Sequence, residues 1–451
     1  MNSRQHTYRE LTLQYMEKIA EHDGLLNSVA EINPDALTIA TMLDNEKGMS
    51  RGALHGVPIL LKDNINTHDK MQTTAGSLAL NNHYASYDAA IVQNLRNAGA
   101  IILGKTNMTE MSNWMASDMP NGYSSRGGQV KNLHNHDPSG SSTGSAVAVA
   151  AGFCVAAVGT ETCGSIIDPS AAAGIVGIKP SAGFFPTHGI VPISSTLDTP
   201  GPMARTVRDA AILLSGMKGQ NDAIYMGSVL YTSVWTQTQK DYIAGLDNAS
   251  IRGLRIGIYN EGKSDPVIKK TIEKLETAGA FIIAEYNGVT PDDPWEYIGD
   301  PIAKHEFKSC INHYLNTYMY GTQKNGISTL DDIIKFNEAN AEKCLKHGQD
   351  ILLECQNSDK KLTTAAYVKA LRRRETAIAD LNKIFSENNL DVLIGADEYL
   401  TIAPLTGFPS GTVPIGKKDD GVPLGMYFIA RHMDESTLIR VMYVVEQMVG
   451  G

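Results

Sequence analysis

Apolar and polar residues alternate along the chain in blocks that predict strands and helices in turn. Residues 56–61 (GVPILL) form a short apolar run typical of a buried strand. Residues 89–98 have helical spacing and end at Gly99, which suits a helix C-cap, and residues 100–103 predict the next strand. The same reading predicts helix 145–152, strand 153–158, helix 206–217, a strand within 251–259, helix 266–278 and strand 281–285.

The later part of the chain contains a helical stretch between two regions of strand pattern. Residues 290–388 are more polar and mostly helical in spacing. Strand patterns then return at 391–394, 411–415 and 425–429, before a final helix over 435–448. Because strand–helix alternation occurs on both sides of this stretch, the sequence predicts one α/β core with an inserted helical region.

Composition and charge narrow the class of protein. The chain has 451 residues, of which 42% are hydrophobic and 20% charged, as in a soluble globular protein with an ample core. It carries 39 basic and 49 acidic residues, a net charge of -10, which argues against a nucleic-acid-binding surface. The one tight basic run, residues 372–374, is interpreted as a solvated helix face.

Cysteine usage and the N-terminus suggest a compartment. The five cysteines are scattered and form no C-x-x-C pair, so neither a disulfide framework nor a zinc site is expected. Residues 1–20 read as an amphipathic helix, unlike a targeting segment. The longest run of small apolar residues, 146–159, is too short to span a bilayer. We therefore expect a cytoplasmic protein that does not bind a membrane.

Two strings match known motifs without their structural context. Residues 99–106 (GAIILGKT) match a P-loop, but the variable positions read as the strand itself and a helix precedes them. Residues 140–144 (GSSTG) match a nucleophile elbow centred on Ser142, but the polar residues 132–139 before it do not predict a strand. We reject both the nucleotide site and the elbow.

Three segments could carry chemistry. Lys62 closes the apolar run at 56–61, and burial of its amine would lower its pKa and make it a general base. Residues 139–145 form a Ser/Gly cluster. Residues 159–166 (GTETCGSI) predict a small-residue turn whose N–H groups could hold an oxyanion, with the Ser165 hydroxyl at its end. Each segment alone also fits ordinary structure, such as a snorkelling lysine or a glycine-rich turn.

Together these segments resemble the amidase signature family, whose members are serine amidases with a Ser–cis-Ser–Lys triad. The resemblance covers nearly the whole chain and is weakest between about 220 and 390. The blocks that carry it are LHGVPILLKDNI, TTAGS, GAIILGKTNMTEMSNW, GSSTGSAVAVAAG, GTETCGSI, GIVGIKPSAGF, LDTPGPMARTVRDAA, GFPSGTVPIG and GVPLGMYFIA.

The resemblance implies a fold and a set of roles. The fold would be a single α/β domain over 1–451, with a large mixed central sheet covered by helices. It would contain a catalytic core, 62–215, and a mainly helical, variable, substrate-side region, 290–388. Lys62 would be the base, Ser141 the bridging serine with a cis peptide bond, and Ser165 the nucleophile, with no metal or cofactor. The oxyanion would be held by the backbone N–H groups of Thr162, Cys163, Gly164 and Ser165.

The chain departs from the family pattern at three positions. Cys163 stands where many members have glycine; we favour a spacer over a residue that narrows the acyl pocket or a cysteine nucleophile, since no histidine is adjacent. Ile167 stands where arginine is frequent, and with residues 122–129 it favours the peptide amidase-like branch. Asp168 beside Pro169 is unusual and has no account from sequence.

The resemblance therefore implies an amidase that releases ammonia or an amine from a small-molecule or peptide amide. Two alternatives stay open: a glutaminase-type A subunit of a tRNA-dependent amidotransferase, which needs a stable partner, and an amidase-fold acyltransferase. Monomer and homodimer are both open. Aromatic residues of the later region are candidates for an apolar pocket or, for most of them, for ordinary core: Trp235, Trp295, Tyr297, Phe307, Tyr314, Tyr318 and Tyr320.

Overall fold

The computed structural model describes residues 6–46, 50–218, 242–259, 266–286, 293–318, 326–357, 362–396 and 401–449. In this part of the chain, one sheet of eleven strands runs through the molecule in the order β1-β3-β2-β6-β8-β7-β12-β13-β11-β9-β10. The strands are β1 (Val29–Ile32), β2 (Pro58–Lys62), β3 (Ile101–Thr106), β6 (Ala156–Glu161), β7 (Val176–Lys179), β8 (Thr199–Ala204), β9 (Arg255–Tyr259), β10 (Phe281–Tyr286), β11 (Val392–Ala396), β12 (Ser410–Lys417) and β13 (Pro423–Ala430).

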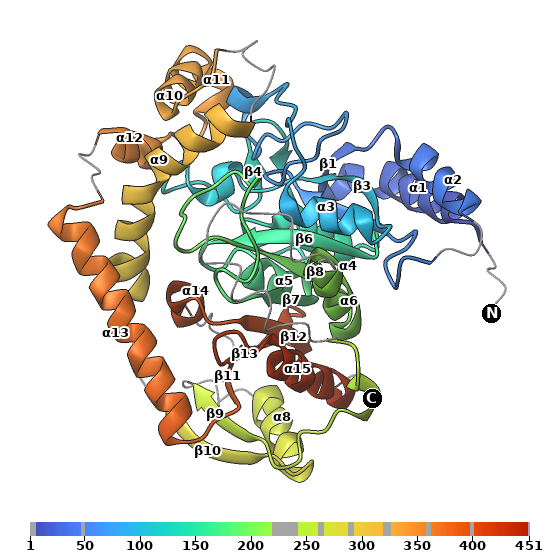
Figure 1. The fold of residues 1–451 in the computed structure, drawn as a ribbon, viewed down its shortest axis with the longest axis vertical. Coiled ribbons are helices and arrows are strands. Elements are labelled where there is room, and N and C mark those ends of the chain that lie inside the picture. The colour runs from blue at the N-terminus through green and yellow to red at the C-terminus, as the bar shows by residue number, and fades with distance from the viewer. Residues whose placement is uncertain are drawn as a thin grey trace.

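Helices cover this sheet (Figure 1). The longer ones are α1 (Tyr8–Leu26), α2 (Ala36–Asn45), α3 (Ala90–Asn97), α4 (Thr143–Ala150), α5 (Ile167–Ala173), α6 (Val207–Lys218), α8 (Pro266–Thr277), α9 (Asp300–Tyr318), α10 (Leu330–Ala339), α12 (Asp350–Asn357), α13 (Ala365–Glu387) and α15 (Glu435–Val449). Short helices α11 (Ala341–Cys344) and α14 (Ile402–Thr406) and the hairpin β4 (Tyr123–Ser124) and β5 (Gly128–Gln129) complete the main elements.

The sheet is mixed, as the resemblance implied. Strand β2 runs parallel to β3 and β6, whereas β8 runs antiparallel to β6 and β7. Strands β12 and β13 form an antiparallel hairpin, and β9 runs parallel to β10 and β11. The predicted α/β class with a large mixed sheet is confirmed.

Side-chain alternation along the strands divides the core into two layers. In β2, Ile59 and Leu61 pack on one face with side chains of α3, α6, α8 and α15. Leu60 lies on the other face, with side chains of α1, α2, α4, α5 and α13. Because successive residues of a strand point to opposite faces, Lys62 belongs to the face of Leu60, towards the start of α4.

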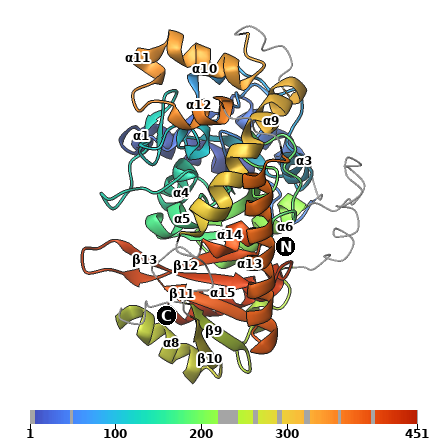
Figure 2. The same ribbon diagram turned by 90° about the vertical axis from the view of Figure 1, so that its left-hand side faces the viewer.

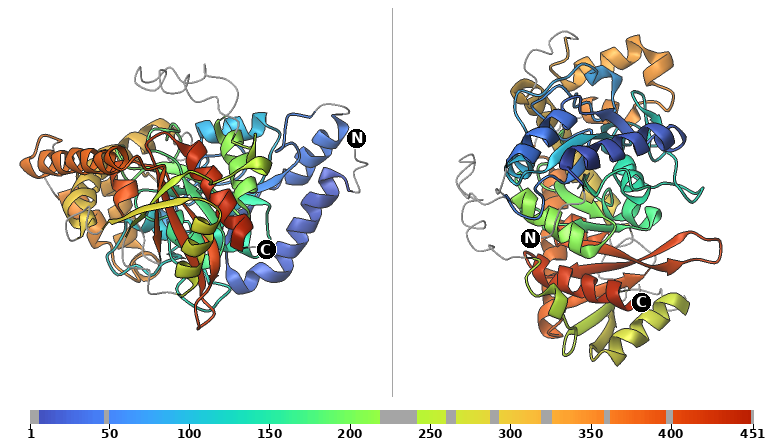
Figure 3. Two further views of the ribbon diagram at one scale, coloured as in Figure 1. Left: turned by 90° about the horizontal axis from the view of Figure 1, so that it is seen from below. Right: turned by 90° about the vertical axis from the view of Figure 1, so that its right-hand side faces the viewer.

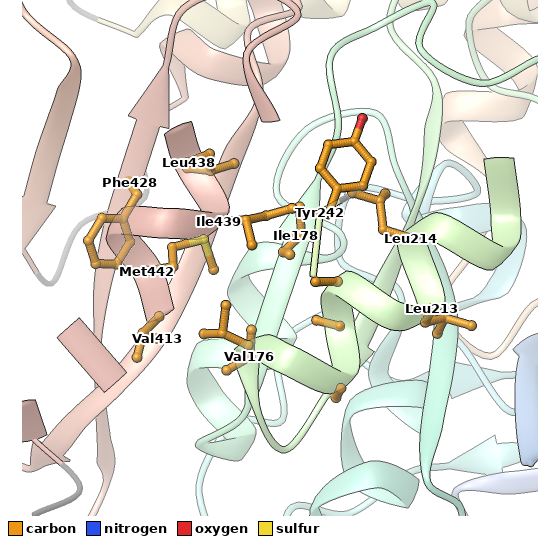
Figure 4. Close-up of a cluster of buried hydrophobic side chains, with 14 of the residues drawn as sticks. Val176, Ile178, Leu213, Leu214, Tyr242, Val413, Phe428, Leu438, Ile439 and Met442 are labelled. Carbon is orange, nitrogen blue, oxygen red and sulfur yellow. The ribbon is translucent and has the colours of Figure 1, made fainter. Parts of the chain in front are cut away.

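Figure 4 shows the first layer where α6 and α15 meet the sheet, with Leu213, Leu214, Leu438, Ile439 and Met442 packed beside Val176, Ile178, Val413 and Phe428. All of these side chains are buried. This layer fixes β7, β12 and β13 against one another in the middle of the sheet.

Helices α9, α10 and α12 form a third packing unit. Side chains of α9, α10 and α12 pack against the segment 75–119 in a separate buried cluster. Figure 1 shows α9 and α13 along one side of the molecule, and Figure 2, which faces that side, shows α13 running past the strands of the C-terminal half below α9. The left view of Figure 3, seen from below, shows the α1–α2 pair (blue) and α13 (orange) on opposite sides of the molecule. In the described part of residues 290–388, the predicted helical character is confirmed.

The structure differs from the predicted elements in several places. Strands β1, β7 and β8 and helix α2 were not predicted, and the predicted strand 153–158 lies further along, at Ala156–Glu161. Strand β8 contains Pro200 and Pro202, which cannot donate to a ladder, so its sequence argues against a central strand. Its partners β6 and β7 nevertheless hold it inside the sheet.

Candidate active site

Lys62 ends β2 with its side chain fully buried. Its Nζ donates to Ser141 Oγ at 2.8 Å and to Thr160 at Oγ1 (3.0 Å) and at the carbonyl oxygen (3.2 Å). Burial lowers the pKa of Lys62 to about 7, against the opposing effect of Asp198 and Glu161. An amine in this state can take up or release a proton near neutral pH.

Ser141 lies just before α4, on the face of the sheet that Lys62 faces. The Gly140–Ser141 peptide bond is cis, as the resemblance implied. Ser141 is fully buried, and its carbonyl oxygen accepts from the Thr109 N–H at 3.1 Å. The structure therefore brings Lys62 and Ser141 together as predicted from distant segments.

Ser165 lies in the turn between β6 and α5. The strand continues to Glu161, so the turn begins at Thr162 and not at Gly159 as the sequence suggested. Gly164 has a φ of 83°, in the left-handed region that favours glycine. The Ser142 N–H donates to the Ser165 carbonyl oxygen at 3.1 Å, which joins this turn to the residue after Ser141.

Glu161 holds the far end of the turn. Its Oε2 accepts from the N–H groups of Ile166 (2.8 Å) and Ile167 (3.1 Å), where α5 begins. A carboxylate at a helix N-terminus satisfies donors that the helix leaves unpaired. Burial, with the nearby Glu161, raises the pKa of Asp168 well above its ordinary value.

Asp198 holds the near end of the turn, at the start of β8. The Thr162 hydroxyl donates to Asp198 Oδ1 at 2.6 Å, and the N–H groups of Ile193 and Ser194 donate to Oδ2. Burial raises the pKa of Asp198 to about 6. Glu161 and Asp198 therefore hold both ends of the segment 162–165 by side-chain hydrogen bonds.

Sequence reasoning missed four residues that shape this site: Thr160, Glu161, Asp198 and Asn64. Asn64 Nδ2 donates to Thr160 Oγ1 at 2.9 Å, so the hydroxyl that contacts Lys62 is itself held in place. Thr160 and Glu161 lie inside the quoted GTETCGSI block, and Asp198 lies inside LDTPGPMA. A polar residue inside an otherwise apolar strand was the signal that could have found Thr160 and Glu161.

The structure supports rejection of both motif-like strings. Residues Ile101–Thr106 are strand β3, preceded by helix α3, and the Lys105 Nζ donates to the carbonyl oxygens of Ile65 and Gln72. Ser142 Oγ donates to the Thr160 carbonyl oxygen and accepts from its N–H. Residues 131–141, all of them described, contain no strand that leads into Ser142, so the elbow context is missing.

Cys163 is half-buried and packs against the sheet layer that contains α4 and α5.

Among the aromatic candidates, Phe307 and Tyr314 are core residues, whereas Tyr297 is exposed. Trp295 is partly buried and meets Trp114 edge-on, with ring centroids 5.9 Å apart. Tyr318 packs at the edge of the same cluster, and Trp235 and Tyr320 lie outside the described residues.

The five cysteines all lie in described residues, and none of them forms a disulfide bond. Within the described ranges, no three or more His, Cys, Asp or Glu side chains gather in a way that could bind a metal ion. None of the described helices is both long enough and apolar enough to cross a membrane.

The structure thus places the Lys62 amine, Ser141 and the turn that contains Ser165 together, at the carboxyl ends of the neighbouring strands β2 and β6. The pattern of the Amidase family matches residues 10–398, and the chain belongs to this family. It is 34% identical to a probable amidase of Arabidopsis thaliana over 99% of this chain and 88% of the relative. Amide hydrolysis is the activity that this membership supports.

Two further similarities bear on the branch of the family. The peptide amidase of Stenotrophomonas maltophilia has the same fold, with a TM-score of 0.89 and 36% identity over 99% of this chain and 94% of that one. The A subunit of the glutamyl-tRNA(Gln) amidotransferase of Exiguobacterium sibiricum is 32% identical over 98% of this chain and 94% of the relative.

Proposed function

We propose that the chain is a serine amidase, in which Ser165 attacks the carbonyl carbon of a carboxamide and forms an acyl-enzyme. Water then cleaves the ester and releases the acid. The observation that carries this proposal is the 2.8 Å hydrogen bond between Lys62 Nζ and Ser141 Oγ, because it joins a buried amine to a hydroxyl beside the Ser165 turn.

The proton route follows from this arrangement. Neutral Lys62 accepts the hydroxyl proton of Ser141, and Ser141 accepts the hydroxyl proton of Ser165 as Ser165 attacks the carbonyl carbon. The tetrahedral intermediate then collapses. The proton returns through Ser141 to the leaving nitrogen, which departs as ammonia or an amine, and the same residues deprotonate the water in deacylation.

The negative charge that develops on the carbonyl oxygen needs donors fixed in advance. We assign this role to the backbone N–H groups of the turn that Glu161 and Asp198 hold. These are the N–H groups of Thr162, Cys163, Gly164 and Ser165. No metal or cofactor has a part in these steps.

The similarity to a peptide amidase favours a peptide amide or a related small carboxamide as the substrate. We propose that residues 290–388 lie on the substrate side and select it, around the catalytic core 62–215. Five cysteines without a disulfide bond fit a reducing compartment such as the cytoplasm. The similarity to the amidotransferase A subunit keeps a glutaminase that works with a partner as the second candidate.

Labelling with a fluorophosphonate probe, with the modified peptide located by mass spectrometry, tests the mechanism. We expect label on Ser165, no label in Ser165→Ala and unchanged labelling of the matched control Asp118→Asn, in a surface turn. Loss of label in Lys62→Ala would extend the assignment to the base. Normal amide turnover by Ser165→Ala would overturn it, and label on Ser142 would restore the elbow.

Amide turnover by the purified chain separates the remaining candidates. Hydrolysis of peptide amides without a partner supports the proposed amidase. Glutamine turnover only in the presence of a co-purifying protein would favour the amidotransferase subunit. Faster product formation with an added amine than with water alone would favour an acyltransferase.

A further inference from the structure

Glu306 is a buried carboxyl side chain from α9, 1% exposed, with no part in the mechanism described so far. Its carboxyl group accepts five hydrogen bonds. Ser194 Oγ (2.6 Å), Ser195 Oγ (3.1 Å) and the Thr196 N–H (3.0 Å) donate to Oε2, and Thr196 Oγ1 (2.5 Å) and Tyr367 Oη (2.7 Å) donate to Oε1. Four of these donors belong to residues 194–196, the loop before β8.

The same loop holds Asp198. The Ser194 N–H donates to Asp198 Oδ2 at 3.0 Å, and the Asp198 N–H donates to the Ser194 carbonyl oxygen at 3.2 Å. Asp198 in turn accepts from the Thr162 hydroxyl. A continuous set of hydrogen bonds therefore leads from the helical region to the first residue of the turn that contains Ser165.

The position of the loop in the sheet explains why it can act on the turn. Thr199 pairs with Glu161 across β8 and β6, so the segment before β8 and the segment after β6 leave the sheet side by side. The loop sequence Ser-Ser-Thr offers rotatable hydroxyl groups and no large apolar anchor. The hydroxyl groups of all three residues donate to the Glu306 carboxyl group, which gives them a common acceptor.

A buried carboxylate is a costly way to fix a loop. Its desolvation stabilises the fold only where every oxygen is well hydrogen-bonded, and apolar packing of the same volume is often at least as stable. Such groups fit a place where geometry matters more than stability. An oxyanion site is such a place, because its N–H donors must be held within about 0.5 Å of the productive geometry.

We propose that Glu306 is a positioning residue for the oxyanion turn, acting through the 194–196 loop, Asp198 and Thr162. In this way the helical region that selects the substrate also sets the geometry in which the transition state is stabilised. The proposal rests on the function proposed above for residues 162–165.

Steady-state kinetics of Glu306→Gln on a peptide amide test it. The amide has nearly the same volume, but its NH2 faces donors in place of an acceptor oxygen. We expect kcat to fall about tenfold or more, the scale for weakened oxyanion stabilisation, with KM within about twofold. Tyr367→Phe is the matched control, because it removes one donor from the same carboxyl group and leaves the four hydrogen bonds that residues 194–196 donate to it, so its kcat should stay within about twofold.

A double-mutant cycle separates positioning from general loss of stability. Thr162→Val removes the hydroxyl group that contacts Asp198. If Glu306 acts through that contact, adding Glu306→Gln to Thr162→Val lowers kcat little further. The proposal would be overturned if the fold-loss of kcat in the double variant equalled the product of the two single losses. It would also be overturned by equal losses of kcat in Glu306→Gln and Tyr367→Phe.

Two further outcomes are informative. If Glu306→Gln does not fold, Thr196→Val makes the same test by removing one donor to Oε1, with a smaller loss of kcat expected and KM unchanged. A wild-type kcat in Thr196→Val, and in Glu306→Gln where that variant folds, would overturn this inference alone, provided that Ser165→Ala is inactive. An active Ser165→Ala would instead overturn the proposed function.

Discussion

The Nζ of Lys62 lies 2.8 Å from the Oγ of Ser141, although 79 positions separate the two residues in the sequence. Strand alternation turns Lys62 towards the face on which α4 begins, and Ser141 stands just before that helix. The amine is fully buried, and its pKa is lowered to about 7. The fold thus provides a base that is partly neutral at pH 7.

Replacement of this amine is the first prediction. Lys62→Met keeps most of the buried stem and removes the base, so we expect kcat/KM to fall by about 10²–10⁴-fold, the usual share of general base catalysis. Thermal unfolding should change much less than activity. Steady-state kinetics at pH 7 to 9 check this, and a loss below about tenfold would show that another group is the base.

Lys105 offers a matched control in the neighbouring strand. It is also fully buried, with a pKa lowered to about 8, but its Nζ donates to the Ile65 and Gln72 carbonyl oxygens and to the Thr73 hydroxyl. Lys105→Met leaves these groups without a donor, so we expect a lower Tm. Its folded fraction should keep activity of the wild-type order.

The pH dependence of the reaction is the second prediction. A base works when neutral, and burial lowers the pKa of Lys62 to about 7, so kcat/KM should rise with pH through about 7. The charged groups that raise this pKa are Asp198 and Glu161. A profile of kcat/KM from pH 5 to 9, with the labelling rate of the fluorophosphonate probe as a second readout, measures it.

Asp198→Asn tests the direction in which the pH profile should move when a charge near Lys62 is removed. Removing a negative charge near the amine destabilises its protonated form, so the rising limb should move to lower pH. The maximum rate should also fall, because the asparagine amide holds Thr162 less well than a carboxylate does. A limb that moves to higher pH would contradict the assignment of Lys62 as the titrating group.

The strands and helices with regular patterns were predictable, and those set by tertiary pairing were not. Helix α15 follows the predicted helix 435–448 closely, because its apolar positions repeat at helical spacing. Strand β8 was missed because Pro200 and Pro202 are poor strand residues. Its place between β6 and β7 depends on contacts that its own sequence does not encode.

The same division applies to the site. The resemblance to a family identified Lys62, Ser141 and Ser165 as candidates, and the structure brings the first two into direct contact. Asp198 and Glu306 escaped notice because their contacts depend on strand order: β6 and β8 must be neighbours before Asp198 can reach the turn, and Glu306 contacts the loop that holds Asp198. Single-sequence patterns carry no information on such neighbours.

Cys163 supports the third prediction. Its side chain is half-buried beside Gly164, two positions before the proposed nucleophile. Cys163→Gly should therefore keep activity and alter selectivity for the acyl group, by about tenfold between small and large acyl chains. Values of kcat/KM for a series of amides with increasing acyl size measure this. Complete inactivity would mean that the thiol has a chemical role.

The last prediction concerns the close packing of α4 against the backbone of Ser28 and Asn107. A Cβ at Gly144 would lie well inside van der Waals contact with the carbonyl oxygens of Asn107 and Ser28. The Gly144 N–H also donates to the Asn107 carbonyl oxygen at 3.0 Å, so these backbones cannot separate without losing a buried hydrogen bond. Gly144→Ala should therefore lower the free energy of unfolding by about 1–3 kcal/mol or more, the scale of overpacking.

Gly24 is the control for this substitution. It lies in α1, where an added Cβ meets nothing within 4 Å, so Gly24→Ala should raise the free energy of unfolding by up to about 1 kcal/mol. Urea unfolding of both variants beside the wild type measures the two signs. Because α4 begins just after Ser141, Gly144→Ala should also lower kcat in its folded fraction, whereas Gly24→Ala should not. Equal stability changes in the two variants would show that the backbone around Ser141 yields to an added methyl group, and that its close packing does not hold Ser141 in place.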